Sequence, residues 1–268
     1  MIKRLITILL LITVVFSMCA CGNEAEYGVK TIQTLESQDY YMAFRNDDML
    51  YYYVTGAVSV LAARGTVGEL SLKWLGADNA VDFNKDETAL DNLPQAEPRT
   101  LLIGVDIDSF PFVYIDSATG SYWGFDIQLA QAVCDYLGWE LQAMTIKKEN
   151  VYDELASGNI DVAWGGIALP EKEVDQFIYT TYGPYIHNDI VIAARQGTVI
   201  SNLKGKNMAM PSTTEAMEAL QSDKKTLNKL GNVFRLQGGT TECFTYLYNG
   251  KCDVILTDST AIKYYNCH

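Results

Sequence analysis

Polar side chains follow four apolar segments of the chain, and their chemistry fits the recognition of a small charged molecule. Asp106 follows "LLIGV", and Gly165 with Gly166 follows "DVAW". The run Ser212–Thr214 follows "NMAMP", and Asp258 ends "CDVILTD". A carboxylate pairs with an ammonium group, whereas the N–H groups at a helix start bind a carboxylate. Each group also has a plainer interpretation as a turn or a helix cap.

The segments that must position these groups alternate between strand and helix patterns. The apolar runs predict strands, and "GFDIQLAQAVCDYLG", "ENVYDELASG", "TEAMEAL" and "ECFTYLYNG" between them predict helices. Strands that alternate with helices predict an α/β fold with a parallel sheet and right-handed crossovers. Ligands bind at the carboxyl ends of such strands, which is where the four polar groups lie. The pattern therefore predicts a ligand cleft.

The part of the chain before residue 100 has a different organisation. Residues 50–64 predict a helix with one apolar face, which Gly65 ends. Thr66 and Glu69 match a capping box that opens a second, shorter helix. Residues 76–100 show no sustained period and are rich in Asp, Asn and Pro, so we expect a linker there.

Residues 1–21 are predicted to be a lipoprotein signal peptide. Lys3 and Arg4 precede the apolar run of residues 5–16, which is too short to span a bilayer. Cys21 follows a small residue and is the predicted lipidation site, with Cys19 as the second choice. The protein is then exported and held at the outer face of the bacterial cytoplasmic membrane by a lipid anchor alone. An ordinary secretory signal with two incidental cysteines is the alternative.

The composition excludes several classes of function. A net charge of −13 argues against a nucleic-acid partner, because phosphates require a basic surface. The sequence has two histidines and neither a CxxC nor an HExxH pattern, so no metal or other cofactor is expected.

The order of the segments resembles the extracellular solute-binding proteins of family 3, which are the amino-acid-type binding proteins of ABC importers. The stretches that carry the resemblance are "LLIGVDIDSFPFVYID", "GFDIQLAQAVCDYLGWEL", "YDELASGNIDVAWGGIAL", "LKGKNMAMPSTTEAMEAL" and "LYNGKCDVILTDSTAIKYY". The resemblance implies a two-lobed, type II periplasmic-binding-protein-like fold with the ligand between the lobes. It also implies a monomer that binds a small molecule, partners an ABC permease and is not an enzyme.

The order of the segments departs from the family in one respect. Family members continue after the "LTDS" strand through a segment similar to "YYMAFRNDD" and finish with a pattern like "GTVGELSLKWLG". Both segments precede residue 100 here, so the chain resembles a circular permutation in which residues 76–100 join the family's original ends. Lobe one is then residues 38–194, and lobe two is residues 24–37 plus 195–268. A truncated protein fused to an unrelated segment is the alternative.

The resemblance also assigns the site. Asp258 matches the aspartate that pairs with the ligand's α-ammonium, and Asp106 matches an acidic position in the first loop. The run at 212–214 matches the helix start that helps to hold the carboxylate. The full expected set of ligand-binding residues is Asp106, Ser109, Phe110, Lys148, Trp164, Gly165, Gly166, Ala168, Lys172, Ser212, Thr213, Thr214 and Asp258.

Several positions depart from the family pattern. Glu173 stands where an arginine clamps the carboxylate, and Ala168 replaces a hydroxyl donor. Ser109 stands at a position that is usually aromatic, with Phe110 beside it, and Lys148 replaces a second aromatic residue.

These departures set the expected ligand. Two retained aspartates favour a cation, and a lysine at 148 or 172 would replace the arginine only as a point charge. Trp164 is either a new cleft wall or a core residue. We therefore expect a small cationic or zwitterionic amine, either an amino acid or a relative without a carboxylate.

Two other functions stay open from the sequence: a sensor or adhesion lipoprotein on the same fold, and a dehydratase-like enzyme, which requires an acid/base pair in the cleft. Any disulfide is expected among Cys243, Cys252 and Cys267, because a bridge from Cys134 would tie the two lobes together.

Overall fold

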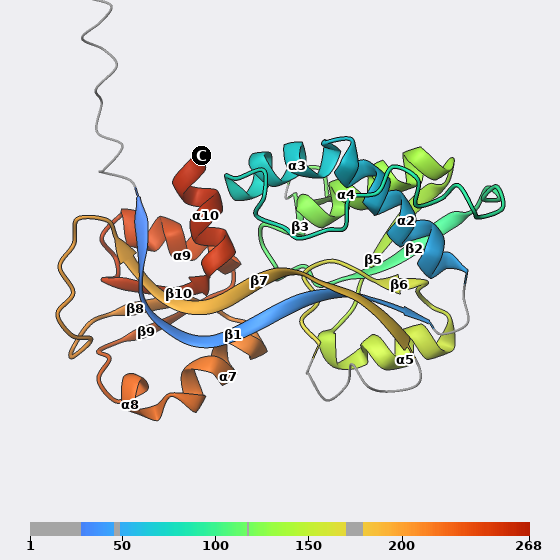
Figure 1. The fold of residues 1–268 in the computed structure, drawn as a ribbon. Helices are drawn as coiled ribbons and strands as arrows, with labels where there is room; N and C mark the ends of the chain where they lie inside the picture. The colour runs from blue at the N-terminus through green and yellow to red at the C-terminus, as the bar shows by residue number, and fades with distance from the viewer. Residues whose placement is uncertain (1–27, 46–48, 117, 170–178) are drawn as a thin grey trace, which may run out of the picture.

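Two long strands join the two lobes of the protein. The computed structural model describes residues 28–45, 49–116, 118–169 and 179–268. Strand β1 (Val29–Arg45) pairs antiparallel with β7 (Tyr179–Arg195) along its whole length. Figure 1 shows these two strands running side by side from one lobe into the other. They are the only extended elements of the described chain that pass through both lobes, and they therefore form the hinge.

All the long strands belong to one eight-stranded sheet, in the order β5-β2-β6-β1-β7-β10-β8-β9. The lobe-one strands are β2 (Thr100–Val105), β5 (Glu140–Thr145) and β6 (Val162–Ala163). The lobe-two strands are β8 (Met208–Pro211), β9 (Val233–Leu236) and β10 (Val254–Asp258). A small separate hairpin is formed by β3 (Tyr114–Ile115) and β4 (Tyr122–Trp123).

The sheet is mixed, so the expectation of a parallel sheet was wrong in part. Pairing is parallel within each lobe, between β2, β5 and β6 and between β8, β9 and β10. It is antiparallel where the hinge strands meet β6 and β10. The physical reason is that β1 and β7 are not parts of crossover units, and they pass between the lobes in opposite directions.

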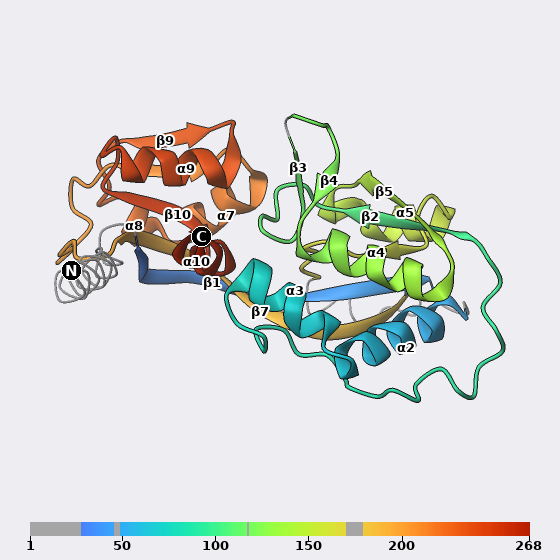
Figure 2. The ribbon, with the colours of Figure 1, turned by 90° about the horizontal axis from the view of Figure 1, so that it is seen from above.

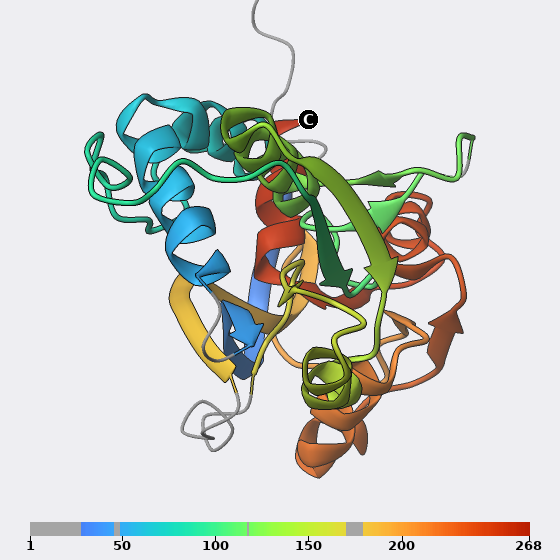
Figure 3. The same cartoon turned by 90° about the vertical axis from the view of Figure 1, so that its right-hand side faces the viewer.

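Helices cover the sheet in both lobes. Lobe one contains α2 (Leu50–Ala63), α3 (Thr66–Leu75), α4 (Phe125–Leu137), the 3-10 turn η1 (Lys148–Asn150) and α5 (Val151–Ser157). Lobe two contains α7 (Thr214–Ser222), α8 (Lys224–Leu227), α9 (Gly239–Tyr248) and α10 (Ser259–Cys267). Figure 3 shows α2 and α4 on one side of the lobe-one strands and α5 on the other. Gly138 ends α4 with a φ of +73°, a left-handed conformation that suits glycine.

The capping box predicted at Thr66 and Glu69 is absent. Gly65, with a φ of +90°, directly follows α2 and is itself the N-cap of α3, and no side chain caps that helix. Thr66 is already helical, so its hydroxyl is not in the position from which a cap bonds the next turn. The backbone of Gly65 instead accepts from the N–H of Glu69 at 3.0 Å.

The second half of β7 packs with the strands of lobe two. Residues 190–193 of β7 pair with β10, and Ile190 and Ile192 pack in one core with Met208 and Leu256. His187 lies opposite Asp39 in the register of β7 with β1.

Residues 76–99 contain no helix or strand, and the segment follows the surface of lobe one from the end of α3 to the start of β2 (Figure 2). The segment is docked against the lobe. The ring of Phe83 is buried and stacks on Tyr185 with 5.1 Å between the ring centroids. The N–H of Asp82 donates to the carbonyl of Tyr185 at 2.8 Å. Packing of this kind fixes the path of a segment that lacks regular structure.

The four described cysteines are unpaired, so no disulfide forms among them. Cys134, Cys243 and Cys252 are buried, whereas Cys267 is exposed. Burial raises the pKa of the Cys134 and Cys243 thiols to about 12, which keeps them protonated. Within the part of the chain that the structure describes, every helix is too short or too polar to cross a membrane.

Candidate functional site

The hinge strands bring Asp258 into a buried polar network. Asn188 on β7 donates through Nδ2 to Oδ1 of Asp258 at 2.7 Å and to the Tyr40 hydroxyl at 3.1 Å. Its Oδ1 accepts from the hydroxyl of Thr260 at 3.0 Å. Asn188 is fully buried, and it therefore ties the end of β10 and the start of α10 to the hinge. Sequence reasoning missed Asn188 and Tyr40, although an asparagine beside the apolar run "DIVIAA" is a usable signal.

Asp106, Ser109 and the glycine pair form one structure at the end of β2. The N–H of Asp106 donates to the carbonyl of Gly165 at 3.1 Å, and the Ser109 hydroxyl donates to the carbonyl of Gly166 at 3.1 Å. Gly166 has a φ of +64°, and a Cβ there would collide with the side chain of Ser109. Ser109 therefore positions the loop, and only glycine fits at 166.

A buried carboxylate that sequence reasoning missed holds the glycine pair from behind. Asp126, in the first turn of α4, accepts from the N–H of Gly166 at 2.9 Å, the Tyr185 hydroxyl at 2.7 Å and the Trp164 indole at 3.2 Å. Burial outweighs these hydrogen bonds and raises the pKa of Asp126 to about 7. Trp164 is fully buried in the lobe-one core, so we remove it from the expected cleft wall.

Lobe two faces this loop with the start of α7. Thr213 is the N-cap, and its hydroxyl accepts from the N–H of Ala216 at 3.2 Å. The Ser212 hydroxyl accepts from the side-chain amide of Gln237 at 3.1 Å. Thr214 is the first residue of the helix.

A small cavity lies at the carboxyl ends of β8 and β10. It measures about 30 Å³ and is lined by Asp108, Pro211, Thr213, Glu215, Thr257 and Asp258 among others. That volume is sufficient for a water molecule. The Oγ1 atom of Thr257 is buried there without a hydrogen-bond partner.

An ion pair links the lobes across the cleft. Nζ of Lys148, on η1 in lobe one, lies 2.9 Å from Oε1 of Glu215, on α7 in lobe two. Both side chains are about one-third exposed (34% and 36%), so the pair lies at the cleft mouth rather than in the core. The sequence placed Lys148 in the site but missed Glu215.

The carboxyl groups of the two lobes act on one another. Burial, together with the charges of Glu215 and Asp106, raises the pKa of Asp258 to about 7, against a lowering contribution from the hydrogen bond of Asn188. Burial likewise raises the pKa of Asp106 to about 6, against a lowering contribution from Lys148. The pKa of Asp108 is raised by burial and by Glu215. This mutual influence means that the four carboxyl groups share one acidic site, which we call the acidic cleft.

Phe110 lies between the lobes beside this cleft. Its ring contacts Tyr264 edge-on at 4.8 Å and lies 5.7 Å from Tyr265, both on α10. Tyr264 also stacks on Trp74 of α3 at 5.8 Å. Figure 2 shows α10 next to α3, between the two lobes. Phe110 therefore packs against lobe two and forms part of the interface between the lobes.

Three expected positions remain. Ala168 is buried and forms an isolated bridge with Tyr40 of β1, so it supports the hinge. Lys172 and Glu173, the residues at the lost arginine clamp, lie outside the described residues, as do Cys19 and Cys21. No group of three or more His, Cys, Asp or Glu side chains among the described residues could hold a metal ion.

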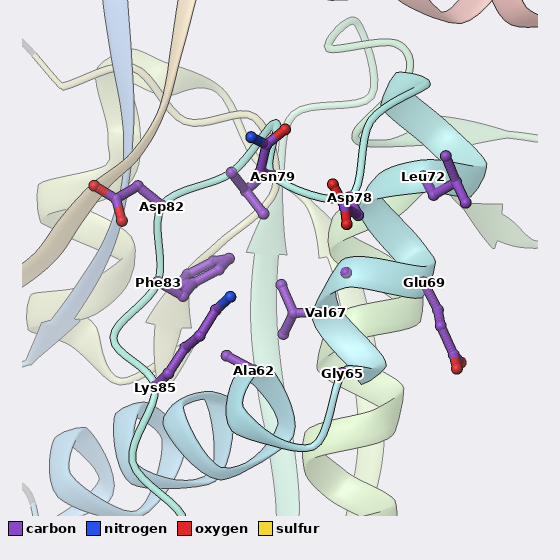
Figure 4. A pocket seen from close by; sticks show the side chains of 12 residues that line it. Ala62, Gly65, Val67, Glu69, Leu72, Asp78, Asn79, Asp82, Phe83 and Lys85 are labelled. Carbon is purple, nitrogen blue, oxygen red and sulfur yellow. The ribbon is translucent and has the colours of Figure 1, made fainter.

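A larger cavity lies away from the acidic cleft. It measures about 690 Å³ and is enclosed by α2, α3 and the segment that follows α3 (Figure 4). Val67, Phe83 and Lys85 point into it, whereas the side chain of Glu69 extends away from its centre. None of the predicted site residues lines it, and it lacks converging groups from both lobes. The cavity results from the way the segment crosses over the helices.

Two α/β lobes joined by crossing strands, with polar groups of both lobes meeting at strand ends, form the architecture of a solute-binding protein. The family model of the bacterial extracellular solute-binding proteins, family 3, matches residues 101–237, which is just over half of the chain. The chain belongs to this family, which is mostly made up of binding proteins without catalytic activity.

Similar proteins include binding proteins and an enzyme. The chain is 23% identical over 171 residues to the "Probable amino-acid-binding protein YxeM" of Bacillus subtilis, covering 62% of each chain. It is 26% identical to "Membrane-bound lytic murein transglycosylase F" of Shewanella denitrificans, covering 63% of this chain and 34% of that protein. The solved structure titled "Ancestral Cationic Amino Acid Solute Binding Protein (AncCDT-1)" is 22% identical with a TM-score of 0.46, over 62% of this chain and 72% of that one. The chain thus spans less than two thirds of the length of the two natural relatives.

Proposed function

We propose that this protein is the substrate-binding component of an ABC importer and that it holds a small cationic amine in the acidic cleft. The observation that supports this proposal is that Asp106 from lobe one and Asp258 from lobe two are both half-buried, and that no described basic side chain forms an ion pair with either of them. Each carboxyl group has a pKa near neutrality because burial disfavours its charged form. A ligand ammonium would supply the missing counterion. The ligand class is an amino acid with a cationic side chain or an amine that lacks the carboxylate.

Further features of the cleft support this proposal. The buried hydroxyl of Thr257 has no partner and lines the remaining cavity, so a ligand donor or acceptor would satisfy it. Asn188 links Asp258 to the hinge strand β7, so the ligand contact and the hinge belong to one network. Opening the lobes about β1 and β7 would admit the ligand, and closure would bury it.

We also propose that the fold is circularly permuted. The front segment, α2 and α3, packs on α4 of lobe one, where a final segment of the family fold belongs. The side chain of Asn266 on α10 accepts from the N–H of Val29 at 2.8 Å and donates to its carbonyl at 2.9 Å. The start of β1 and the end of α10 therefore lie side by side, as the new ends of a permuted chain would. The family model begins to match at residue 101, directly after the linker, which agrees with this order.

The predicted lipid on Cys21 would attach the protein through the segment before β1, and thus through lobe two. This arrangement fits a receptor that delivers its ligand to a permease at the outer face of the cytoplasmic membrane. A sensor or adhesion lipoprotein that binds the same ligand without transport is the alternative function.

An enzyme is the second candidate, because Lys148 and Glu215 form an acid/base pair at hydrogen-bond distance, 2.9 Å, at the cleft mouth. Every ligand that binds should therefore be recovered and analysed after incubation with the purified protein. Unchanged ligand supports a binding protein, and a dehydrated or cleaved product supports the enzyme.

The deciding experiment is a thermal-shift and calorimetric screen of the protein from residue 22 onward against the twenty amino acids and a panel of amines. A ligand at one hundred times its Kd should stabilise the protein by about 2.7 kcal/mol. Asp258→Asn should weaken binding at least 100-fold, because the carboxylate that pairs with the ammonium is gone. Asp91→Asn, at an exposed aspartate, is the control and should bind as the wild type does. Equal affinity of the two variants would refute the proposed site.

A further inference from the structure

Glu215 stands where a ligand carboxylate would otherwise find a positive charge. Lys148 is the described cation of the acidic cleft, and its Nζ is already engaged by Glu215 at 2.9 Å. A ligand carboxylate at this ammonium would either lie beside the Glu215 carboxylate, which repels it, or displace the glutamate. The displaced glutamate would then have to return to solvent or lie against Asp106 and Asp258, whose charges repel it.

The other carboxyl groups of the acidic cleft also disfavour a carboxylate on the ligand. Among the described residues, four carboxyl groups, those of Asp106, Asp108, Glu215 and Asp258, are close enough to influence one another, and Lys148 supplies the one ammonium that acts on them. Because Lys148 is paired with Glu215, the described part of the cleft leaves the other three carboxyl groups without an ion-pair partner. An additional carboxylate on the ligand is repelled, whereas a second ammonium is attracted.

The start of α7 carries a carboxylate of the protein beside its hydroxyl groups. According to the family resemblance, this helix start helps to hold the ligand carboxylate. Here the Thr213 hydroxyl accepts from the N–H of Ala216 and the Ser212 hydroxyl accepts from the side-chain amide of Gln237, so each keeps its O–H as a donor for a ligand. Glu215 lies in the first turn of the same helix, where a carboxylate gains from the helix dipole. The protein's own glutamate thus takes the electrostatic position of the ligand's carboxylate.

We propose that Glu215 is a specificity-determining residue: by occupying Lys148 it makes the cleft select carboxylate-free diamines over the corresponding amino acids. This inference rests on the proposed function of the cleft as an amine site. The predicted ligands carry two ammonium groups, one for Asp106 and one for Asp258.

The test uses pairs of probes that differ only in a carboxylate: lysine and cadaverine, ornithine and putrescine, arginine and agmatine. Calorimetry on the wild-type protein should give at least tenfold tighter binding of the amine in the best-bound pair. Glu215→Gln should reduce that ratio at least tenfold, because Lys148 becomes free to hold a carboxylate and one attractive charge is lost. Glu218→Gln, at an exposed position on the same helix, is the matched control and should keep the wild-type ratio.

A second variant, Lys148→Met, should increase the preference for the diamine instead of reducing it. Lys148→Met leaves the Glu215 carboxylate free, so affinity for the diamine should rise and affinity for the amino acid should fall. Thermal melts of each ligand-free variant will show whether it folds as the wild type does.

Three outcomes would overturn the inference. The first is a wild-type preference for the amino acid of each pair. The second is a Glu215→Gln variant whose two affinities change by the same factor or not at all. The third is the binding of another cationic compound of the panel, such as histidine, and none of the six probes, by the wild type; the proposed function then stands while the role of Glu215 fails. If no compound of the wider panel binds, the proposed function fails as well.

Discussion

At the scale of single residues, burial has a larger effect than neighbouring charges on the pKa values of Asp106 and Asp258 in the acidic cleft. Exposed carboxylates titrate far below neutrality, but Asp106 and Asp258 have pKa values raised to about 6 and about 7 because partial burial disfavours their charged forms. Asn188 opposes part of this effect on Asp258 by donating a hydrogen bond to it. Small changes of pH around neutrality therefore change the net charge of the acidic cleft.

This titration predicts a pH-dependent affinity. An ammonium ligand remains protonated between pH 5 and pH 8, while Asp106 and Asp258 lose their protons in this range. Affinity should therefore rise about tenfold or more from pH 5 to pH 8, as measured by calorimetry at constant ionic strength. An affinity that stays level or falls over this range would contradict the assigned carboxyl groups.

The stability of the ligand-free protein should change in the opposite direction. In the unfolded chain these carboxyl groups titrate near 3.8, so between that pH and about 7 the folded state binds more protons. Their contribution to the free energy of unfolding is therefore fully present below pH 3.8 and is lost as the pH rises to about 7. Urea unfolding of the wild type should show a larger loss over this range than Asp258→Asn, which lacks one of the groups. Parallel curves for the two proteins would contradict the raised pKa of Asp258.

At the scale of elements, the loop after β2 depends on α4. Asp126 accepts three hydrogen bonds from groups at or next to the glycine pair, and it is fully buried. The Asp126 carboxylate thus fixes α4 to the loop after β2. The position of Ser109, and with it the entry to the cleft, depends on this contact because the Ser109 hydroxyl donates to the carbonyl of Gly166.

Loss of the Asp126 carboxylate should destabilise the protein. Asp126→Ala leaves the donors of Gly166, Trp164 and Tyr185 unpaired in the core, and each unpaired donor costs about 1–3 kcal/mol. We expect a loss of at least about 3 kcal/mol in urea unfolding, together with weaker ligand binding. Asp135→Asn, on the exposed face of the same helix, should leave both quantities unchanged. A wild-type melting curve for Asp126→Ala would show that the network carries no stability.

At the scale of the whole molecule, the two lobes communicate through a few elements. The β1–β7 ribbon provides the hinge, α10 packs on α3 and Phe110 at one side, and the Lys148–Glu215 pair closes the other side. The order in which the chain visits these elements matters little for the contacts themselves, because segments near in space are joined by short or docked connections.

The proposed permutation leads to a direct prediction. A rearranged chain that begins at Arg99, runs through His268, continues after a short Gly/Ser loop into Gly28 and ends at Gly76 should fold to the same structure. The loop need only be short because Asn266 and Val29 are hydrogen-bonded to each other. Circular dichroism and ligand affinity should match those of the natural order, with a modest loss of stability because the docked Phe83 segment is removed. The same rearrangement with the loop opened elsewhere, inside β7, is the control and should not fold. A rearranged chain that fails to fold would favour the fusion interpretation.

The sequence by itself determined the local elements. The helices predicted from "GFDIQLAQAVCDYLG" and "ENVYDELASG" form and end at the last glycine of each pattern, Gly138 and Gly158. The strands at "LLIGV", "NMAMP" and "VILTD" appear where the apolar runs placed them. Local periodicity and glycine conformation act within a few residues, so they can be read directly. Asp106 and Asp258 were predicted for the same reason, because each follows a recognisable strand.

Only the tertiary structure decided which distant side chains meet. Glu215 meets Lys148 from the other lobe, Asn188 reaches Asp258 from β7, and Asp126 reaches Gly166 from α4. These contacts join residues far apart in the sequence, and no local pattern encodes them. Burial, which sets the pKa of each carboxyl group and places Trp164 in the core, is likewise a property of the assembled lobes. The chemistry of the site therefore depends on packing that the sequence specifies only through the complete fold.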